Sequence, residues 1–324
     1  KWQEPPMKPR LLIVSCLICL CSALVQAKPF VVGISTWNSY PTSVAGFKQS
    51  LTLKGLIEGK DVIYIEKSAQ ADKQKQQEIA ELFKREKVDL VYSLTTSGTV
   101  IIKQVLPEST PIVFSIVTYP ADAGLIESME YSANNLVGTS NYVPEKYFHE
   151  IIDGVFPHAK SVLIFHRYGE PNSKIQAVNL KRLIKKTGAD VKIISATSLQ
   201  DLEQKAKKYL YKLNPEVLVT TTDTLMQNGG EKVLIKLAKK ENVAILSSNK
   251  TGIEAGATLG PVADFKILGN VSGLMAVKIL KESTLPTHMP SKYMQPPLIL
   301  VNKPAKKSTG IVIPEHFKNV RYVD

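Results

Sequence analysis

The chain has 324 residues, 44% of them hydrophobic, and its 41 Lys and Arg residues against 29 Asp and Glu give a formal net charge of +12. This length allows one large or two ordinary domains, and the apolar content is that of a globular protein. The charge does not indicate a nucleic-acid partner, because many lysines, such as Lys205, Lys207 and Lys208, lie on the polar faces of predicted helices.

The N-terminal segment has the layout of a secretory signal peptide. A basic start at residues 7–10 precedes the apolar run Leu11–Val25, and the small residue Ala27 follows. About fifteen apolar-rich residues are too few to span a bilayer. We therefore expect residues 1–27 to be upstream residues and signal peptide, with cleavage near Ala27. The mature chain would begin near Lys28, in the periplasm or another extracytoplasmic compartment.

The cysteines offer a second interpretation of this segment. Cys16, Cys19 and Cys21 all lie within it, so cleavage would leave a mature chain without thiols or disulfides. Cys21 could instead accept a lipid anchor. The residue before it is Leu20, where a lipid-attachment motif has a small residue, so soluble export is favoured over lipidation.

From Lys28 onward, short apolar runs alternate with segments of helical periodicity, which predicts repeated βαβ units and an α/β fold with parallel sheets. The predicted strands are Phe30–Ser35, Asp61–Ile65, Leu90–Leu94, Ile112–Ile116, Ser161–Phe165, Val191–Ser195, Val217–Thr220, Ala244–Leu246 and Leu298–Val301. The predicted helices are Gln74–Lys87, Glu145–Phe156, Asn172–Lys186, Leu199–Leu210, Leu225–Lys240 and Phe265–Lys281.

This pattern of strands and helices restarts after Pro144, which predicts two doubly wound parallel-sheet lobes of ordinary domain size. Ligands of such lobes bind beyond the carboxyl ends of the strands. Polar and aromatic residues gather at those ends in both halves, so two lobes facing each other through these loops would form a clamp. The loops concerned are 36–41, 95–99 and 118–120 in the first half, and 167–173, 221–223 and 247–250 in the second.

Several short blocks, taken in order and spacing, carry a family resemblance. They are Val31–Ile34, Pro111–Phe114, Val117–Leu125, Asn135–Ser140, Ala257–Gly260 and Ser308–Pro314. With these blocks the chain resembles ABC-transporter substrate-binding proteins of the type I periplasmic binding fold, in the group that includes tryptophan- and tyrosine-binding members.

The resemblance implies two lobes joined by a hinge. Lobe 1 would comprise residues 28–142 plus 258–285, and lobe 2 residues 143–257 plus 286–324. The late helix Phe265–Lys281 would pack back on lobe 1 and the tail on lobe 2.

Two positions depart from the family pattern. Tyr119 precedes Pro120, and Asn249 and Lys250 follow the last strand of lobe 2, where the family often has acidic residues. If those acidic groups hold a ligand ammonium elsewhere in the family, their absence leaves the usual amino-acid ligand open to question. Asn249 is nevertheless included among the expected ligand contacts.

Two helix starts offer anion sites from opposite lobes. A helix beginning at Ser97, with the hydroxyl of Thr96, suits a carboxylate, because its first N–H groups are free and its dipole is positive there. Asn172 and Ser173 open a helix in lobe 2 and resemble an Asn-Ser pair that contacts ligand in the family. Simple capping is the alternative role for all four residues.

Asp223 follows an apolar strand and could pair with a ligand ammonium, or cap the next helix; the two roles are compatible. Four aromatic residues in the predicted cleft loops could stack on a planar ligand, although core packing is the ordinary role of such rings. They are Trp37, Tyr40, Tyr119 and Tyr168.

Nothing in the sequence favours an enzyme. The five histidines show no metal-ligand spacing, no Ser lies in a Gly-x-Ser-x-Gly turn, and Gly229 and Gly230 fall inside a helical pattern rather than at a strand-to-helix turn. We expect no cofactor and no metal.

The sequence thus predicts a monomeric, non-enzymatic binding protein that delivers a small solute to ABC permease and ATPase subunits. The solute would be an amino acid, aromatic ones included, or a related small carboxylate. The alternative is a sensory protein of the same fold that docks on a membrane histidine kinase or cyclase.

Overall fold

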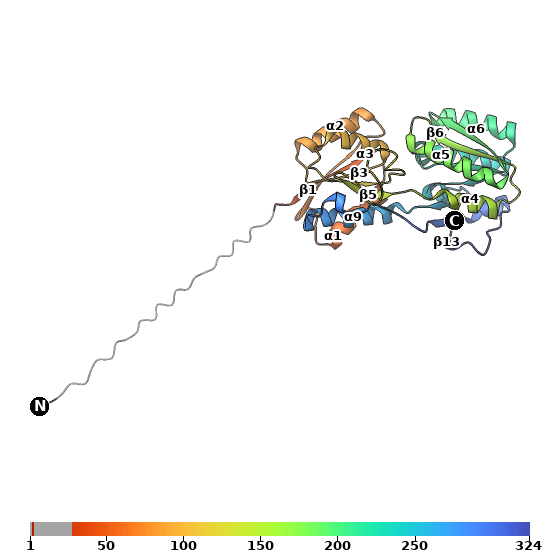
Figure 1. Cartoon of the computed structure of the whole chain (residues 1–324). Coiled ribbons are helices and arrows are strands. Elements are labelled where there is room, and N and C mark those ends of the chain that lie inside the picture. Colours follow the sequence, from red (N-terminus) through yellow and green to blue (C-terminus); the bar gives the residue numbers. More distant parts are fainter. Residues whose placement is uncertain (1, 3–27) are drawn as a thin grey trace.

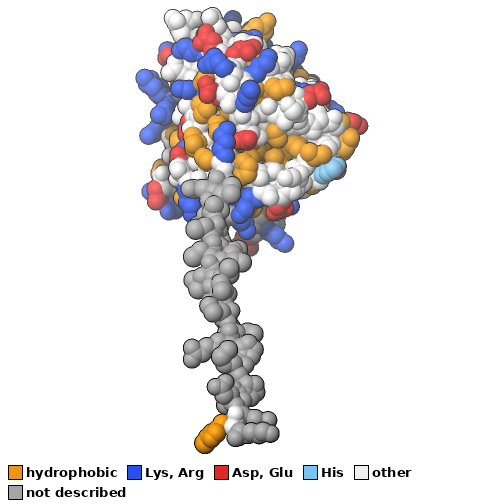
Figure 2. All heavy atoms as spheres, turned by 90° about the vertical axis from the view of Figure 1, so that its left-hand side faces the viewer, with side chains coloured by type: hydrophobic (Ala, Val, Ile, Leu, Met, Phe, Trp, Pro, Cys, Tyr) orange, Lys and Arg blue, Asp and Glu red, His pale blue; other side chains and the backbone are white. Residues whose placement is uncertain are grey.

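The computed structural model describes Trp2 and residues 28–324, which form two α/β lobes side by side (Figure 1). The predicted signal peptide and Cys21 lie outside the described residues. Each lobe is built on one sheet with helices on both faces, so the predicted fold class is confirmed. On the end of lobe 1 that faces the viewer in Figure 2, basic side chains are interspersed with acidic and hydrophobic ones.

Lobe 1 is built on a six-stranded sheet of order β11-β5-β4-β3-β1-β2, with parallel pairing throughout. Its strands are β1 (Phe30–Thr36), β2 (Val62–Ser68), β3 (Leu90–Leu94), β4 (Ile112–Ser115), β5 (Leu136–Ser140) and β11 (Lys292–Tyr293). Its helices are α1 (Pro41–Leu53), α2 (Lys73–Arg85), α3 (Thr96–Val105) and α9 (Phe265–Glu282).

Lobe 2 is built on a seven-stranded sheet of order β13-β12-β10-β9-β8-β6-β7, in which only β10 and β12 pair antiparallel among the pairings described. Its strands are β6 (Ser161–Arg167), β7 (Asp190–Ala196), β8 (Val217–Thr220), β9 (Ala244–Leu246), β10 (Leu259–Val262), β12 (Leu298–Asn302) and β13 (Val320–Val323). Its helices are α4 (Glu145–Val155), α5 (Pro171–Ile184), α6 (Leu199–Leu213), α7 (Glu231–Glu241), α8 (Lys250–Glu254) and α10 (Lys303–Thr309).

Helices α1 and α9 pack almost backbone to backbone on one face of the lobe 1 sheet. Gly46 and Gly269 make this possible, because a Cβ at Gly269 would lie 2.1 Å from the carbonyl oxygen of Ser43, and one at Gly46 would lie 2.3 Å from that of Lys266. The late helix therefore returns to lobe 1, as the sequence predicts, and β12 and β13 place the tail in lobe 2.

The strand pairing moves two of the predicted lobe boundaries. Strand β10, expected in lobe 1, pairs with β9 and β12 in the lobe 2 sheet. Strand β11, expected in lobe 2, pairs with β5 in the lobe 1 sheet. The chain therefore passes between the sheets at 141–144, at 263–264 and at 294–297.

The predicted helix Leu225–Lys240 is interrupted near its start, so the prediction of one continuous helix is wrong there. Residues Asn228 and Gly229 have non-helical backbone angles, with φ +115° at Gly229, and regular helix begins only at Glu231. Glycine tolerates this left-handed conformation, so Gly229 breaks the helical pattern that its neighbours suggest.

Candidate functional site

A narrow cleft lies between the lobes, at the carboxyl ends of their strands, and holds a cavity of about 20 Å³. This is room for about one water molecule, so an amino-acid-sized solute requires the two walls to move apart. Its lining comes from both lobes and is mostly polar. Lobe 1 contributes Tyr40, Thr95, Thr96, Ser97, Ile116, Thr118 and Asn141, and lobe 2 contributes Glu170, Asn172, Thr222, Asp223, Thr224 and Gln227.

The lobe 1 wall centres on the start of α3. Thr95, rather than Ser97, caps the helix: its hydroxyl accepts a hydrogen bond from the N–H of Gly98 at 3.4 Å. The N–H groups of Thr96 and Ser97 belong to the first turn and have no carbonyl partner within the helix. This wall therefore offers backbone donors, hydroxyls and the positive end of a helix dipole.

Backbone strain is concentrated on the same wall. Thr95 has φ +73° and Ile116 has φ +56°, although both are β-branched residues for which positive φ is unfavourable. Each such residue costs about 1–3 kcal/mol and persists where the surrounding structure holds it, which is common at ligand sites. Both residues line the cleft.

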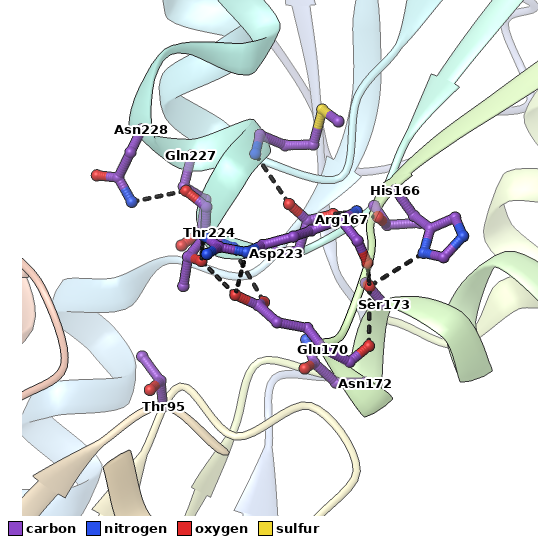
Figure 3. A network of polar contacts seen from close by, with 12 residues as sticks. Thr95, His166, Arg167, Glu170, Asn172, Ser173, Asp223, Thr224, Gln227 and Asn228 are labelled. Carbon is purple, nitrogen blue, oxygen red and sulfur yellow. Dashed lines mark hydrogen bonds and ion pairs between the residues drawn. The ribbon is translucent and has the colours of Figure 1, made fainter. Parts of the chain in front are cut away.

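The lobe 2 wall carries two buried carboxylates, Glu170 and Asp223. Glu170 precedes α5 and accepts hydrogen bonds from the hydroxyl of Thr224 and from its N–H, the latter at 3.2 Å. Arg167 lies 3.4 Å from Glu170 through Nε and donates to the Thr224 hydroxyl at 2.8 Å. Figure 3 shows this network opposite Thr95 of lobe 1. One cation therefore balances one of the two acidic groups.

Asp223 is 2% exposed and accepts hydrogen bonds from the N–H of Arg167 (3.0 Å), the Thr221 hydroxyl (2.6 Å) and the N–H of Met226 (2.9 Å). It thus caps the turn that follows β8 while lining the cleft. Burial raises the pKa of Asp223 to about 7; the nearby charge of Glu170 adds to the rise and these three hydrogen bonds oppose it. The charge of this carboxyl therefore responds to pH near neutrality.

A direct contact joins the lobes across the cleft. The hydroxyl of Tyr40 donates to Oε1 of Gln227 at 2.8 Å, and the Tyr40 ring packs edge-on against Phe265 with centroids 5.9 Å apart. Burial raises the pKa of Tyr40, as do the charges of Glu170 and Asp223. The two lobes are therefore closed on each other in this structure.

Comparisons with known proteins decide the family. The model of the family described as ABC transporter substrate binding protein matches residues 31–320. The chain belongs to this family. It is 28% identical over 256 residues to the tyrosine-binding protein of Clostridioides difficile strain R20291, a match that covers 77% of this chain and 72% of the relative.

Two solved structures share the fold over most of the chain. One is an ABC domain from Streptococcus pneumonia in complex with L-Trp, with a TM-score of 0.84, 20% identity, and coverage of 92% of this chain and 100% of the other. The second is the ligand-free, open structure of a substrate-binding protein with adhesive properties from Clostridium difficile, with a TM-score of 0.71, 26% identity, and coverage of 91% and 99%. These matches establish the fold of type I periplasmic binding proteins. Members of the family bind small molecules and act with ABC permeases.

Part of the predicted site is brought together in the cleft. Tyr40, Thr96, Ser97, Asn172 and Asp223 line it. Asn172 also donates from Nδ2 to the carbonyl of Thr222 at 2.9 Å, which ties α5 to the loop after β8. Ligand contact by these five residues stays a prediction.

Two of the predicted aromatic residues, Trp37 and Tyr168, are not part of the cleft lining. Trp37 is 5% exposed, belongs to the buried apolar cluster of lobe 1 that also holds Phe83, and has its Cβ next to Gly98. Tyr168 is 68% exposed and lines a separate groove of lobe 2 together with Lys174; this groove shares Glu170 with the cleft. Sequence places both in cleft loops, but side-chain direction depends on the packing around each residue.

Tyr119 belongs to the hinge. Its hydroxyl donates to Oε1 of Glu145, while Tyr142 donates to Oε2 at 2.7 Å and Asn179 to Oε1 at 3.2 Å. Glu145 opens α4 directly after the first passage between the sheets, and Tyr119 follows β4 of lobe 1. The departure from the family pattern at Tyr119 thus lies outside the cleft lining.

Ser173 and Asn249 are occupied by internal hydrogen bonds. The single hydroxyl hydrogen of Ser173, which is fully buried, is shared between the carbonyls of Arg167 (2.8 Å) and Glu170 (3.0 Å). Asn249 donates from Nδ2 to Glu231 and to the carbonyl of Thr221. Both stabilise the loops that carry the cleft residues.

Glu170 and Gln227 are cleft residues that sequence reasoning missed. Glu170 could have been found, because it stands between a strand and the helix-starting Pro171, in a loop already assigned to the cleft. Gln227 has no sequence signal, since its role depends on a partner 187 residues away.

Within residues 28–324 and Trp2, no three His, Cys, Asp or Glu side chains are grouped so as to hold a metal ion. In the same part of the chain, no helix combines the length and apolar character needed to cross a membrane.

Proposed function

We propose that the protein closes its two lobes around a small zwitterionic solute, an amino acid, and delivers it to an ABC permease for import. One observation carries the proposal: the two walls of the cleft are electrostatically opposite. Lobe 1 presents the start of α3 with its hydroxyls, and lobe 2 presents the buried carboxylates Glu170 and Asp223. A zwitterion matches both walls at once.

The ammonium group of the solute would lie against lobe 2. Arg167 balances Glu170, whereas Asp223 accepts only from neutral donors among the hydrogen bonds described. A ligand cation would supply the missing positive charge, and in a closed, dry cleft such a pair is stronger than at a surface. Glu170 and Asp223 thus supply the acidic groups that positions 119 and 249 lack.

The carboxylate of the solute would lie at the start of α3. The N–H groups of Thr96 and Ser97 and the neighbouring hydroxyls are donors of the kind that bind anions at helix N-termini. Placing the two charged ends on different lobes makes each ligand contact stronger in the closed state. Closure by hinge motion at the three passages between the sheets then follows from ligand binding.

The side chain of the solute would face Tyr40 and Ile116, the large apolar groups of the lining. A ring would stack well on Tyr40. The names of two similar proteins, one tyrosine-binding and one in complex with L-Trp, support an aromatic amino acid. We therefore propose tyrosine and tryptophan as the first candidates.

Transport by an ABC system requires the binding protein to work outside the cytoplasm. The signal-peptide layout of residues 1–27 supports this location. The permease and its ATPase subunits are accordingly the proposed partners.

A thermal-shift screen tests the proposal. The mature chain from Lys28 is unfolded and refolded to remove carried-over ligand, then heated with amino acids, small carboxylates, nucleosides and sugars. A ligand at a hundredfold excess over its Kd adds about 2.7 kcal/mol to the unfolding free energy, and so raises Tm. A shift with aromatic amino acids is expected; silence with every amino acid, together with a shift from a sugar or nucleoside, would overturn the proposal.

A further inference from the structure

A chain of four side chains runs from the buried interior of lobe 2 to the contact between the lobes. It consists of Glu231, Asn249, Gln227 and Tyr40, and each donates to the one before it. Tyr40 and Gln227 line the cleft, while Glu231 and Asn249 are each 2% exposed and lie behind it. The directions of these hydrogen bonds are set from the interior end, where the Asn249 amide donates to Glu231 and to the carbonyl of Thr221.

Glu231 is the acceptor at the start. Its Oε1 accepts from the hydroxyls of Thr220 and Ser247, the latter at 2.7 Å, and from Nδ2 of Asn249 at 3.0 Å. Asn249 also donates from Nδ2 to the carbonyl of Thr221 at 3.1 Å. Both hydrogens of this amide are therefore used on the interior side, and its Oδ1 must face Gln227.

The orientation of Asn249 fixes that of Gln227. Nε2 of Gln227 donates to Oδ1 of Asn249 at 3.1 Å, which leaves Oε1 facing lobe 1. There it accepts the hydroxyl of Tyr40 at 2.8 Å. If the amide of Gln227 were reversed, Nε2 would face the hydroxyl and Oε1 would face another acceptor, and the contact with Asn249 would be lost.

We propose that Glu231 is a positioning residue for lobe closure: through Asn249 it holds the Gln227 amide with its acceptor toward Tyr40. The inference rests on the proposed function, in which closure of these lobes traps the solute. It adds to that function a preformed acceptor on lobe 2 that Tyr40 meets as the lobes close.

The carboxyl of Glu231 is held through one oxygen: Oε1 accepts all three described hydrogen bonds, whereas the buried Oε2 accepts none and lies against Gly252. A Cβ at Gly252 would lie 1.4 Å from Oε2, so the carboxyl occupies space that only a glycine leaves free. Burial raises the pKa of Glu231, while its donors Ser247, Thr220 and Asn249 oppose the rise. Because the chain of hydrogen bonds depends only on the acceptor Oε1, an uncharged side chain of the same shape with an oxygen at this place would hold Asn249 in the same orientation.

A double-mutant cycle on the ligand-free protein tests the proposal through the unfolding equilibrium. The variants are Tyr40→Phe, Glu231→Met and the double variant, with Glu231→Gln as the conservative control. A hydrogen bond of this kind changes the equilibrium constant about two- to tenfold, so the double variant should be two- to tenfold more stable than the sum of the single effects predicts. Glu231→Gln, which keeps Oε1, should restore the wild-type response to Tyr40→Phe.

Purely additive effects would overturn the proposal, because Glu231 would then stabilise lobe 2 without reaching Tyr40. If Glu231→Met does not fold, Asn249→Ala breaks the same chain of hydrogen bonds one step closer to the cleft. Coupling between Asn249→Ala and Tyr40→Phe would then support the proposal, and additive effects would overturn it. No ligand is needed for the cycle. A loss of coupling with amino-acid binding intact would therefore reject the positioning role alone, whereas failure of binding with coupling intact would reject the proposed function alone.

Discussion

Acidification is expected to weaken amino-acid binding through Asp223. The carboxyl pairs with a ligand ammonium only when ionised, and burial and the charge of Glu170 raise its pKa to about 7. Below that pH the carboxyl must lose its proton before it can pair with the ligand. Affinity should therefore fall about tenfold per pH unit below 7 and level off above it. Between pH 7, where half of the carboxyls are already protonated, and pH 5 the loss is about fiftyfold, or ~2.3 kcal/mol.

Isothermal titration calorimetry from pH 5 to pH 8, with the amino acid that gives the largest thermal shift, measures this dependence directly. At pH 6, titration in two buffers of different ionisation enthalpy should show about one proton released for each ligand bound. Asp223→Asn is the matched control: it should bind weakly and with the same Kd across the range. A wild-type Kd that does not change between pH 5 and pH 8 would refute the assignment of the ammonium to Asp223.

Three further outcomes follow. Without ligand, the folded pKa of Asp223 lies above the unfolded one, so the unfolding free energy should fall by about 1.4 kcal/mol for each unit that the pH rises from 4 to 7. Denaturant titrations of the wild type should show this fall, and those of Asp223→Asn should not. Tyr119→Phe removes a hydrogen-bond donor to Glu145 at the hinge and should lower the unfolding free energy in urea by about 1 kcal/mol without changing which ligands bind. A changed ligand preference would show that Tyr119 contacts the solute. Trp37→Ala should cost about 3–5 kcal/mol as a core truncation and weaken planar and aliphatic ligands alike in calorimetry; a selective loss of planar ligands would show that Trp37 stacks on the solute.

Strongly apolar strands of the fold were predictable, and the structure shows why others were not. Runs such as Leu90–Leu94 and Val217–Thr220 are mostly apolar, fully buried segments with the predicted bounds. Helix α1 was missed because Ser43, Gly46 and Ser50 stand on its buried face and hide the apolar periodicity. Strand β10 contains Pro261, a residue that ordinarily argues against a strand interior.

Site residues were predictable when their position at the end of a strand was enough to place them in the cleft. They were not predictable when the direction of the side chain determined whether they reach it. Asp223 follows β8 and reaches the cleft because the carboxyl ends of parallel strands meet there. Trp37 follows β1 in the same way but turns into the core, while Tyr168 turns outward to solvent. Gln227 meets Tyr40 of the other lobe across 187 residues, a contact that no local sequence pattern encodes.

Binding of a matched ligand set tests the central claim most directly. The amino acid selected by the screen is titrated beside its deaminated acid and its decarboxylated amine, which keep the same side chain. Each analogue leaves one wall of the cleft unpaired, on the side of Asp223 or of Thr96, and loss of one partner of a buried charge pair costs about 2–5 kcal/mol. Both analogues are predicted to bind at least roughly thirtyfold more weakly than the amino acid. An analogue that binds as tightly as the amino acid would contradict the account.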